Sequence, residues 1–278
     1  PVDPVLMFSN HKGIHKSRIE KRQRKLIVRL AFLKPFLKRG EKLLLITTCY
    51  SPLGSLGQYR TGFVFIYLKR SLLVFTNRRM LHVPTTPGYK YRQSLAQVDY
   101  EGCSAINLKR GMLNILYAKF NRVEYFRNLA VSERRKIRAL LQVHIKPKGL
   151  KTEFSNRNFI CPQCTRLLPL DTYKCEHCQL KFKSKAKAML MAVLLPGGGY
   201  FYVRHYLIGF LSAAVEIFLL LYFVTSLQDT LQGLSGSLIY AVIIGTIYLI
   251  IKIVSVIHST EFVCEYIPTK KKIEVKPQ

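Results

Sequence analysis

Acidic residues are scarce in this sequence, and the signatures of several enzyme classes are absent. Only 15 of the 278 residues are Asp or Glu, against 44 Lys and Arg, so the formal net charge is +29. The chain contains no GxSxG, no phosphate-binding GxxxxGK[ST] loop and no HExxH. These absences exclude the hydrolases, nucleotide-binding proteins and metalloproteases that depend on those motifs. The sequence therefore favours a protein that is not an enzyme.

The positive charge is confined to one part of the chain. Residues 1–187 contain 38 of the Lys and Arg and 10 of the Asp and Glu, a net charge of +28, whereas the last 91 residues have a net charge of +1. A basic part joined to an apolar part suggests a soluble region held against an anionic surface, either lipid or nucleic acid. Residues 1–13 have no apolar run long enough for a signal peptide, so we expect internal segments to provide the membrane attachment.

Residues 1–39 are predicted to be a basic leader that contains an amphipathic helix, with residues 1–13 as a loose start. The segment 14–39 is dense in Lys and Arg and becomes apolar between residues 26 and 37, where Pro35 limits the length of a helix. One interpretation is a helix that lies on a membrane. The other, which we favour, is a helix whose apolar face packs on the next domain, because a single apolar face is usually part of a core.

Residues 40–145 predict a β-rich domain closed by a helix. Runs of β-branched and aromatic residues, separated by turn signals, predict strands at 42–49, 62–68, 72–76, 80–83, 96–101, 105–108 and 112–120. Ser132 is a suitable N-cap for a following helix, in which Ile137, Leu140 and Leu141 form an apolar stripe. The expected fold class is α+β, with a small antiparallel β-barrel capped by this C-terminal helix.

Two consecutive segments of this domain carry a family resemblance. LLVFTNRRMLHV (72–83) and YRQSLAQVDYEG (91–102), followed by a helix, resemble the bacterial pleckstrin-homology-like and GRAM-type domains. Members of those families often bind lipid headgroups or peptides, so the resemblance implies a binding surface of that kind. The candidate anion or lipid patch near the strand turns consists of Lys69, Arg70, Arg78 and Arg79.

After a polar linker at 146–159, four cysteines form two CxxC pairs separated by ten residues. They are Cys161, Cys164, Cys175 and Cys178. Two CxxC knuckles that face each other make a closed tetrahedral sulfur site suited to structural Zn²⁺, so residues 160–182 are predicted to form a zinc ribbon. The motif resembles the small zinc ribbons found beside bacterial membrane segments. His177 is expected to be an exposed loop residue rather than a ligand.

Residues 183–267 are predicted to be a helical membrane domain. The apolar segments 206–227 and 237–257 are each about 21 residues long, enough to cross a bilayer core of about 30 Å. The segment 188–205 is interrupted by Pro196 and three glycines, which predicts a re-entrant piece, an interfacial piece or a broken helix. A basic collar able to attract anionic lipid precedes it, formed by Lys181, Lys183, Lys185 and Lys187.

The charges around these segments predict a topology. The loop 228–236 contains no Lys or Arg, whereas the collar and the tail at 268–278 are basic. By the positive-inside rule, both termini and the soluble domains face the cytoplasm of a multi-pass protein in the inner (cytoplasmic) membrane. Four of the seven cysteines lie in the two CxxC pairs, and the other three, Cys49, Cys103 and Cys264, are far apart. This pattern favours a metal site in a reducing compartment over a disulfide framework.

The string LPGGGYFYVRHYLIG (195–209) resembles the two-transmembrane-helix domain family, through its glycine triplet, its Phe-Tyr pair and the later Gly209. The resemblance implies membrane anchoring. Glu216 and Lys252 are the ionisable residues well inside the predicted spans, and such residues are functional candidates. We expect Glu216 to pack uncharged between helices. Lys252 can either reach towards Glu216 or extend to the interface, and we favour the interface.

These features predict a membrane-anchored, non-enzymatic adaptor or scaffold. Its basic cytoplasmic head would bind anionic lipid of the inner leaflet or a protein partner, and Zn²⁺ would stabilise it. The alternative is a membrane-tethered protein that contacts nucleic acid, because zinc ribbons and basic stretches also bind phosphate. Nucleic-acid binders place aromatic residues among basic ones on a sheet face. Here Phe63, Phe65 and Tyr67 alternate within an apolar strand, which favours lipid or protein.

Overall fold

The computed structural model describes residues 1–52, 67–152, 155–169, 172–233 and 237–269. These residues divide into two compact units at the step from Lys181 to Phe182. We call residues 1–181 the head and residues 182–269 the helical unit. The head mixes antiparallel sheets with helices, and the helical unit is entirely α-helical apart from short connections, so the fold class is α+β as predicted.

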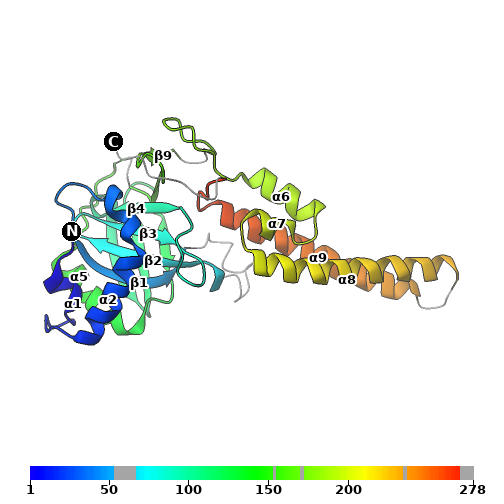
Figure 1. The fold of residues 1–278 in the computed structure, drawn as a ribbon, viewed down its shortest axis with the longest axis horizontal. Helices are drawn as coiled ribbons and strands as arrows, with labels where there is room; N and C mark the ends of the chain where they lie inside the picture. Colours follow the sequence, from blue (N-terminus) through cyan, green and yellow to red (C-terminus); the bar gives the residue numbers. More distant parts are fainter. Residues whose placement is uncertain (53–66, 153–154, 170–171, 234–236, 270–278) are drawn as a thin grey trace. The chain divides into compact units, whose positions relative to one another are not determined.

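Two antiparallel sheets form the head (Figure 1). The first sheet has the order β1-β2-β3-β4-β8-β9, and its strands are β1 (Leu43–Tyr50), β2 (Arg70–Thr76), β3 (Arg79–Pro84), β4 (Leu95–Asp99), β8 (Asn158–Ile160) and β9 (Leu167–Leu168). The second contains β5 (Cys103–Lys109), β6 (Met112–Tyr117) and β7 (Val123–Phe126). A single bridge between Tyr50 and Arg127 links the two sheets. The closed barrel that the sequence predicted is not found among the described residues.

The predicted strands at 42–49, 72–76, 80–83, 96–101, 105–108 and 112–120 match β1 to β6, with ends that differ by a few residues. The predicted strand at 62–68 lies outside the described residues as far as Ile66, and Tyr67 and Leu68 are helical. The sequence analysis missed β7, β8 and β9. All three are only two to four residues long, too short for the alternation of apolar and polar residues to be recognised.

One hydrophobic core lies between the two sheets and the helix α5 (Arg134–Val143). Ile137 and Leu140 of α5 are buried in it and Leu141 packs against it, which confirms the apolar stripe. Ser132 is not the N-cap, because a short 3₁₀ turn (Val131–Glu133) precedes the helix. The Ser132 hydroxyl instead accepts a hydrogen bond of 2.6 Å from Arg22.

A second core lies on the other face of the first sheet, where the leader covers it. The leader forms α1 (Pro4–Phe8), α2 (Ser17–Arg29) and a 3₁₀ helix (Ala31–Phe36). Leu26, Leu33 and Phe36 are buried against apolar residues of β1, β2 and β3. Gln23 of α2 also exchanges two hydrogen bonds with the backbone of Ile46 in β1. The apolar face of the leader therefore packs on the head, as we favoured, and residues 4–8 are helical rather than loose.

The described residues of the helical unit form four helices. They are α6 (Lys185–Leu194), α7 (Gly198–Tyr202), α8 (Tyr206–Leu231) and α9 (Ser237–Val263). Helices α8 and α9 are long and apolar enough to cross a membrane, and they contain the two predicted spans. Most of their large apolar side chains are exposed, as expected for surfaces that face lipid rather than a protein core. The segment 188–205 is a broken helix, one of the three forms predicted for it.

The glycine triplet is explained by close packing at the break between α6 and α7. Gly197 has a φ of +64°, and a Cβ placed there would lie 2.1 Å from the carbonyl oxygen of Gly209 in α8. A Cβ on Gly199 would lie 2.7 Å from both Ala192 of α6 and Ser259 of α9. Any larger residue would force these backbones apart, so the triplet allows the broken helix to pack directly on α8 and α9.

The packing of the leader can be tested by a pair of substitutions. Leu33 is 1% exposed and Val28 is 76% exposed, although the two are five positions apart. We expect Leu33→Ala to lower the free energy of unfolding by about 2–5 kcal/mol, because it leaves a cavity. Val28→Ala should change it by less than about 0.5 kcal/mol. Denaturant unfolding of the full chain in detergent measures both, and equal effects would show that the leader is not part of the core.

Candidate functional site

The four cysteines of the two CxxC pairs form one cluster in the head. All four Sγ atoms lie within 4.8 Å of one another. Cys161 and Cys178 have their sulfurs 3.4 Å apart, and Cys164 and Cys175 have theirs 3.6 Å apart. These separations are far longer than a disulfide bond of about 2.05 Å. They are close to the value of about 3.8 Å expected for sulfurs at 2.3 Å from a tetrahedral zinc ion.

Each CxxC pair sits in a knuckle with the same backbone pattern. The amide of Cys161 donates to Arg166, and the amide of Thr165 donates back to Cys161. The second knuckle repeats this pattern, with Cys175 bonded to Leu180 and Gln179. Thr165 and Gln179 both adopt a φ of +60°, the left-handed conformation that closes each turn. The two knuckles are therefore near-copies that present their sulfurs to a common point.

Three of the four cysteines are buried and Cys178 is partly exposed. Burial raises the pKa of the Cys161 thiol above its ordinary range, so a cation is needed to hold its thiolate at neutral pH. Four thiolates in a closed set suit Zn²⁺ and leave no position for a substrate. His177 is exposed and is not part of the cluster.

The cysteine module is joined to the sheet of the head. Strand β8, which ends one residue before Cys161, pairs with β4, and β9 pairs with β8. Arg157, next to β8, forms an ion pair of 3.1 Å with the buried Glu124 of β7. Part of the predicted linker at 146–159 is therefore a strand, and the first cysteine knuckle continues directly from the first sheet.

If the four cysteines hold zinc, the amount of zinc bound per chain can be predicted. Protein purified under reducing conditions should contain about one zinc per chain, as measured by elemental analysis. Cys161→Ser or Cys175→Ser should lower the retained zinc by about tenfold or more, because a closed site needs all four thiolates. Cys264→Ser is the control, since Cys264 is exposed and lies outside the cluster. If Cys161→Ser retained as much zinc as Cys264→Ser, the assignment of the site would be wrong.

The four residues of the candidate patch do not lie together. Lys69 and Arg70 are at one end of β2 and Arg78 follows the other end, and a strand of seven residues spans about 20 Å. Lys69 is buried, and the Arg70 guanidinium stacks on the ring of Tyr67 at 3.9 Å. Of the four, only Arg78 is fully exposed.

Arg79 is turned inward and forms a buried ion pair with Glu41. Its guanidinium donates to both carboxylate oxygens, at 3.0 and 2.9 Å, and also to the carbonyl oxygen of Phe36 and the side chain of Gln97. Burial opposes ionisation of Glu41, but the hydrogen bonds from Arg79 and from the Lys38 backbone lower its pKa overall. The pair thus connects the leader, β1, β3 and β4 at one point.

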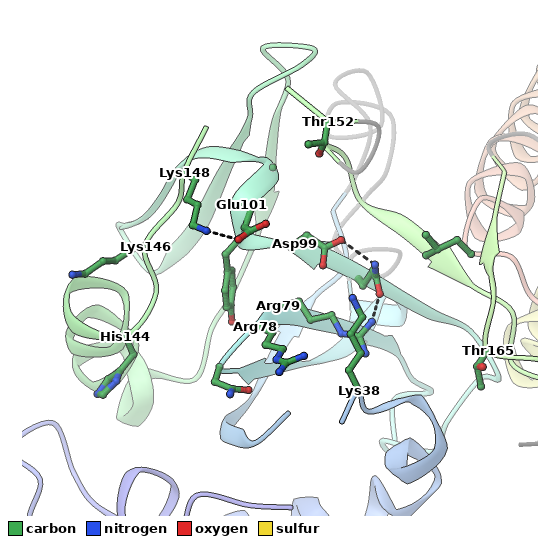
Figure 2. A pocket seen from close by; sticks show the side chains of 15 residues that line it. Lys38, Arg78, Arg79, Asp99, Glu101, His144, Lys146, Lys148, Thr152 and Thr165 are labelled. Carbon is green, nitrogen blue, oxygen red and sulfur yellow. Dashed lines mark hydrogen bonds and ion pairs between the residues drawn. The ribbon is translucent and has the colours of Figure 1, made fainter. Parts of the chain in front are cut away.

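A basic pocket lies directly beside this ion pair (Figure 2). Its volume is about 750 Å³, within the range of small-molecule sites. Five Lys and Arg side chains line it against two carboxylates, Asp99 and Glu101. In the view of Figure 2, Lys38 and Arg78 approach Asp99 from below, and Lys148 reaches Glu101 from the left. Apart from Arg78 and Arg79, the sequence analysis did not select these cations, because the fold brings them together from separate segments.

A serine and a histidine are hydrogen-bonded inside the head, but they lack the chemistry of a nucleophilic pair. Ser51 Oγ lies 3.0 Å from His82 Nε2, and His82 Nδ1 lies 3.2 Å from a guanidinium nitrogen of Arg157. Because Arg157 can only donate, Nδ1 accepts and the proton is on Nε2, which donates to Ser51. Burial and the nearby Arg157 and Lys69 charges lower the pKa of His82 well below its ordinary value. His82 therefore cannot remove the serine proton, and the pair is part of the buried polar core.

The basic collar is divided in the structure. Lys185 and Lys187 are exposed in the first turn of α6, and Lys181 is exposed at the end of the head. Lys183 is buried in the helical unit, where its ammonium donates to the carbonyl oxygen of Tyr202 and lies 5.1 Å from that ring. Lys185 and Lys187 are thus the collar residues of the helical unit that present their charge to the surroundings.

Glu216 and Lys252 form a buried ion pair between α8 and α9. Lys252 Nζ lies 2.7 Å from Glu216 Oε2, so the favoured extension of Lys252 to the interface was wrong, and Glu216 has a charged partner. Lys252 also donates to the carbonyl oxygens of Ala192 and Leu195 at the C-terminal end of α6, at 3.1 and 3.3 Å. A cation there satisfies carbonyl groups that the broken helix leaves open. Ser212 donates to the other oxygen of Glu216 at 2.7 Å.

This ion pair predicts a non-additive response to substitution. Lys252→Met should destabilise the helical unit by about 3–5 kcal/mol, because it leaves Glu216 buried without its partner. The double variant Glu216→Gln/Lys252→Met should be more stable than the single Lys252→Met variant. The exposed Lys187→Met in the first turn of α6 is the matched control and should change the stability by less than about 0.5 kcal/mol. Thermal unfolding in detergent measures these variants and Glu216→Gln alone, and a double variant whose loss of stability equals the sum of the two single losses would contradict the pairing.

Comparison of the chain with protein-family models, with curated proteins and with solved structures finds no match in any of the three.

Proposed function

We propose that this protein is a membrane-anchored, non-enzymatic adaptor of the inner (cytoplasmic) membrane of a bacterium. In this proposal α8 and α9 anchor the chain, and the head docks on the anionic inner leaflet. The head is taken to be of the pleckstrin-homology-like type, since seven antiparallel strands in two sheets are followed by a packed helix. The cysteine cluster holds Zn²⁺ in a structural role.

The observation that carries the proposal is the separation of charge between the two units. Residues 1–181 contain 35 Lys and Arg and 10 Asp and Glu, a net charge of +25, whereas residues 182–269 have a net charge of +1. A head of this charge is drawn to a surface of anionic lipid, and each basic residue near the surface contributes about 1 kcal/mol. Attachment through the two apolar helices would keep it within reach of that surface.

The proposed orientation rests on where the basic residues flank the two helices. Lys185 and Lys187 are exposed in the first turn of α6, and Lys270 to Lys272 follow the end of α9 in sequence. The last turn of α8 and the connection to α9, residues 228–236, contain no Lys or Arg. The positive-inside rule then places the head and both ends of the chain in the cytoplasm, with the α8–α9 connection outside. This compartment is also one in which the cysteine thiols stay reduced.

Hydrogen–deuterium exchange of the full-length protein in lipid nanodiscs tests the docking. Nanodiscs of neutral lipid are compared with nanodiscs that contain about one third anionic lipid. We expect slower exchange in exposed head segments on the anionic discs only, and loss of this protection at about 1 M salt, where charges are screened beyond about 3 Å. Equal exchange on the two kinds of disc would reject docking on lipid and leave a protein partner as the target of the head.

A further inference from the structure

The basic pocket of the head contains cations that do not all form ion pairs within the described part of the chain. Among the described residues, the side chains of Lys38 and Arg78 make no ion pair, although both are exposed and line the pocket. In contrast, Arg79 is paired with Glu41, and Lys148 is paired with Glu101. Lys38 and Arg78 are therefore available for an anionic group from outside the chain.

The two cations are held in place by the turn structure around them. Thr76 Oγ1 accepts hydrogen bonds from the amides of Arg78 and Arg79, which fixes the turn from β2 to β3. Because Arg79 points inward to Glu41, its neighbour Arg78 points outward. The amide of Lys38 donates to Glu41 as well, at 2.8 Å, so the backbone that carries this lysine is anchored to the same ion pair. A guanidinium and an ammonium on one anchored frame suit a phosphate group.

The pocket also contains a hydrogen-bond acceptor, the carboxylate of Asp99. Asp99 lies at the end of β4 in the centre of the lining residues (Figure 2). Gln97 donates to Asp99 Oδ2 at 2.9 Å. Within the described part of the chain this is the one hydrogen bond of the Asp99 side chain. Burial raises the pKa of Asp99 above its ordinary value, although Lys38, Arg79 and Gln97 act to lower it. A hydroxyl donor on a ligand would satisfy this carboxylate, whereas a bare phosphate would be repelled by it.

We propose that this pocket binds a phosphorylated polyol of the glycerophosphate class, with the phosphate on Lys38 and Arg78 and a hydroxyl group on Asp99. The pocket volume of about 750 Å³ accommodates such a ligand. Lys146 and Lys148 also line the pocket and add to its positive potential. The ligand is either a soluble glycerophosphate or the headgroup of phosphatidylglycerol. In the second case the inference deepens the proposed function and rests on it.

Calorimetric titration of the full-length protein in neutral nanodiscs tests the recognition chemistry. The probes are glycerol 3-phosphate, inorganic phosphate and glycerol. We expect glycerol 3-phosphate to bind about tenfold or more tightly than inorganic phosphate, and glycerol to show no saturable binding. Asp99→Ala should bring the two phosphate compounds to similar affinities, because it removes both the carboxylate that accepts from the hydroxyl group and the repulsion of phosphate.

A charge-matched pair of variants separates the pocket from general electrostatics. Lys38→Gln/Arg78→Gln should weaken glycerol 3-phosphate binding by about tenfold or more. Lys25→Gln/Arg138→Gln removes the same charges from exposed positions outside the pocket and should weaken binding by about twofold or less. Circular dichroism and thermal unfolding confirm that both variants are folded. Equal losses in the two double variants, or equal affinities of the wild type for the two phosphate compounds, would overturn the proposal.

Nanodiscs of two compositions then distinguish the source of the ligand. Phosphatidylglycerol and phosphatidylserine are compared at the same charge density, with hydrogen exchange of the pocket segments as the readout. Stronger protection on phosphatidylglycerol, reversed by glycerol 3-phosphate, identifies a lipid headgroup. Binding of glycerol 3-phosphate without docking on either lipid supports a soluble ligand and rejects the proposed function. Equal docking on both lipids with no glycerol 3-phosphate binding rejects the pocket proposal and leaves the proposed function standing.

Discussion

The buried ion pair between Arg79 and Glu41 is the contact on which the head depends. It joins the end of the leader, the start of β1, the turn from β2 to β3 and the side chain of Gln97 in β4. A buried pair of this kind adds little stability of its own, but removing one partner is costly. The ion pair matters here because it orients two side chains. It holds Arg79 inward, and the neighbouring Arg78 is exposed. The residues that the ion pair orients, Arg78 and Arg79, line the basic pocket.

The helical unit also contains a buried ion pair, formed by Glu216 and Lys252. Its broken helix leaves carbonyl groups open at the end of α6, in surroundings where water is scarce if α8 and α9 span a bilayer. Lys252 donates to two of these carbonyl groups while Glu216 balances its charge. Gly197 and Gly199 bring the backbones close enough for this arrangement. Glu216 and Lys252 thus have a structural explanation in the contacts that hold α6, α8 and α9 together.

The cysteine module contributes to the head in two ways. Through β8 it extends the first sheet beyond β4, and through Arg157 it reaches the second sheet. Its first knuckle also lines the basic pocket, with Thr165 next to Cys164 and Leu167 in β9. So short a module has little hydrophobic core of its own. A bound metal ion would therefore stabilise the two knuckles and also the side of the pocket that Thr165 and Leu167 line.

The sequence alone determined the features that depend on local spacing or on long composition runs. The CxxC spacing identified the four metal-ligand candidates, and the long apolar runs identified α8 and α9. The apolar segment 26–37 and the apolar stripe of α5 identified the faces that these parts of the chain bury. Only the tertiary structure decided which charged side chains meet, because those contacts join residues far apart in the chain. The ion pairs of Arg79 with Glu41 and of Lys252 with Glu216, and the gathering of Lys38, Arg78 and Asp99 around one pocket, are set by the packing of whole elements, so local periodicity does not decide them.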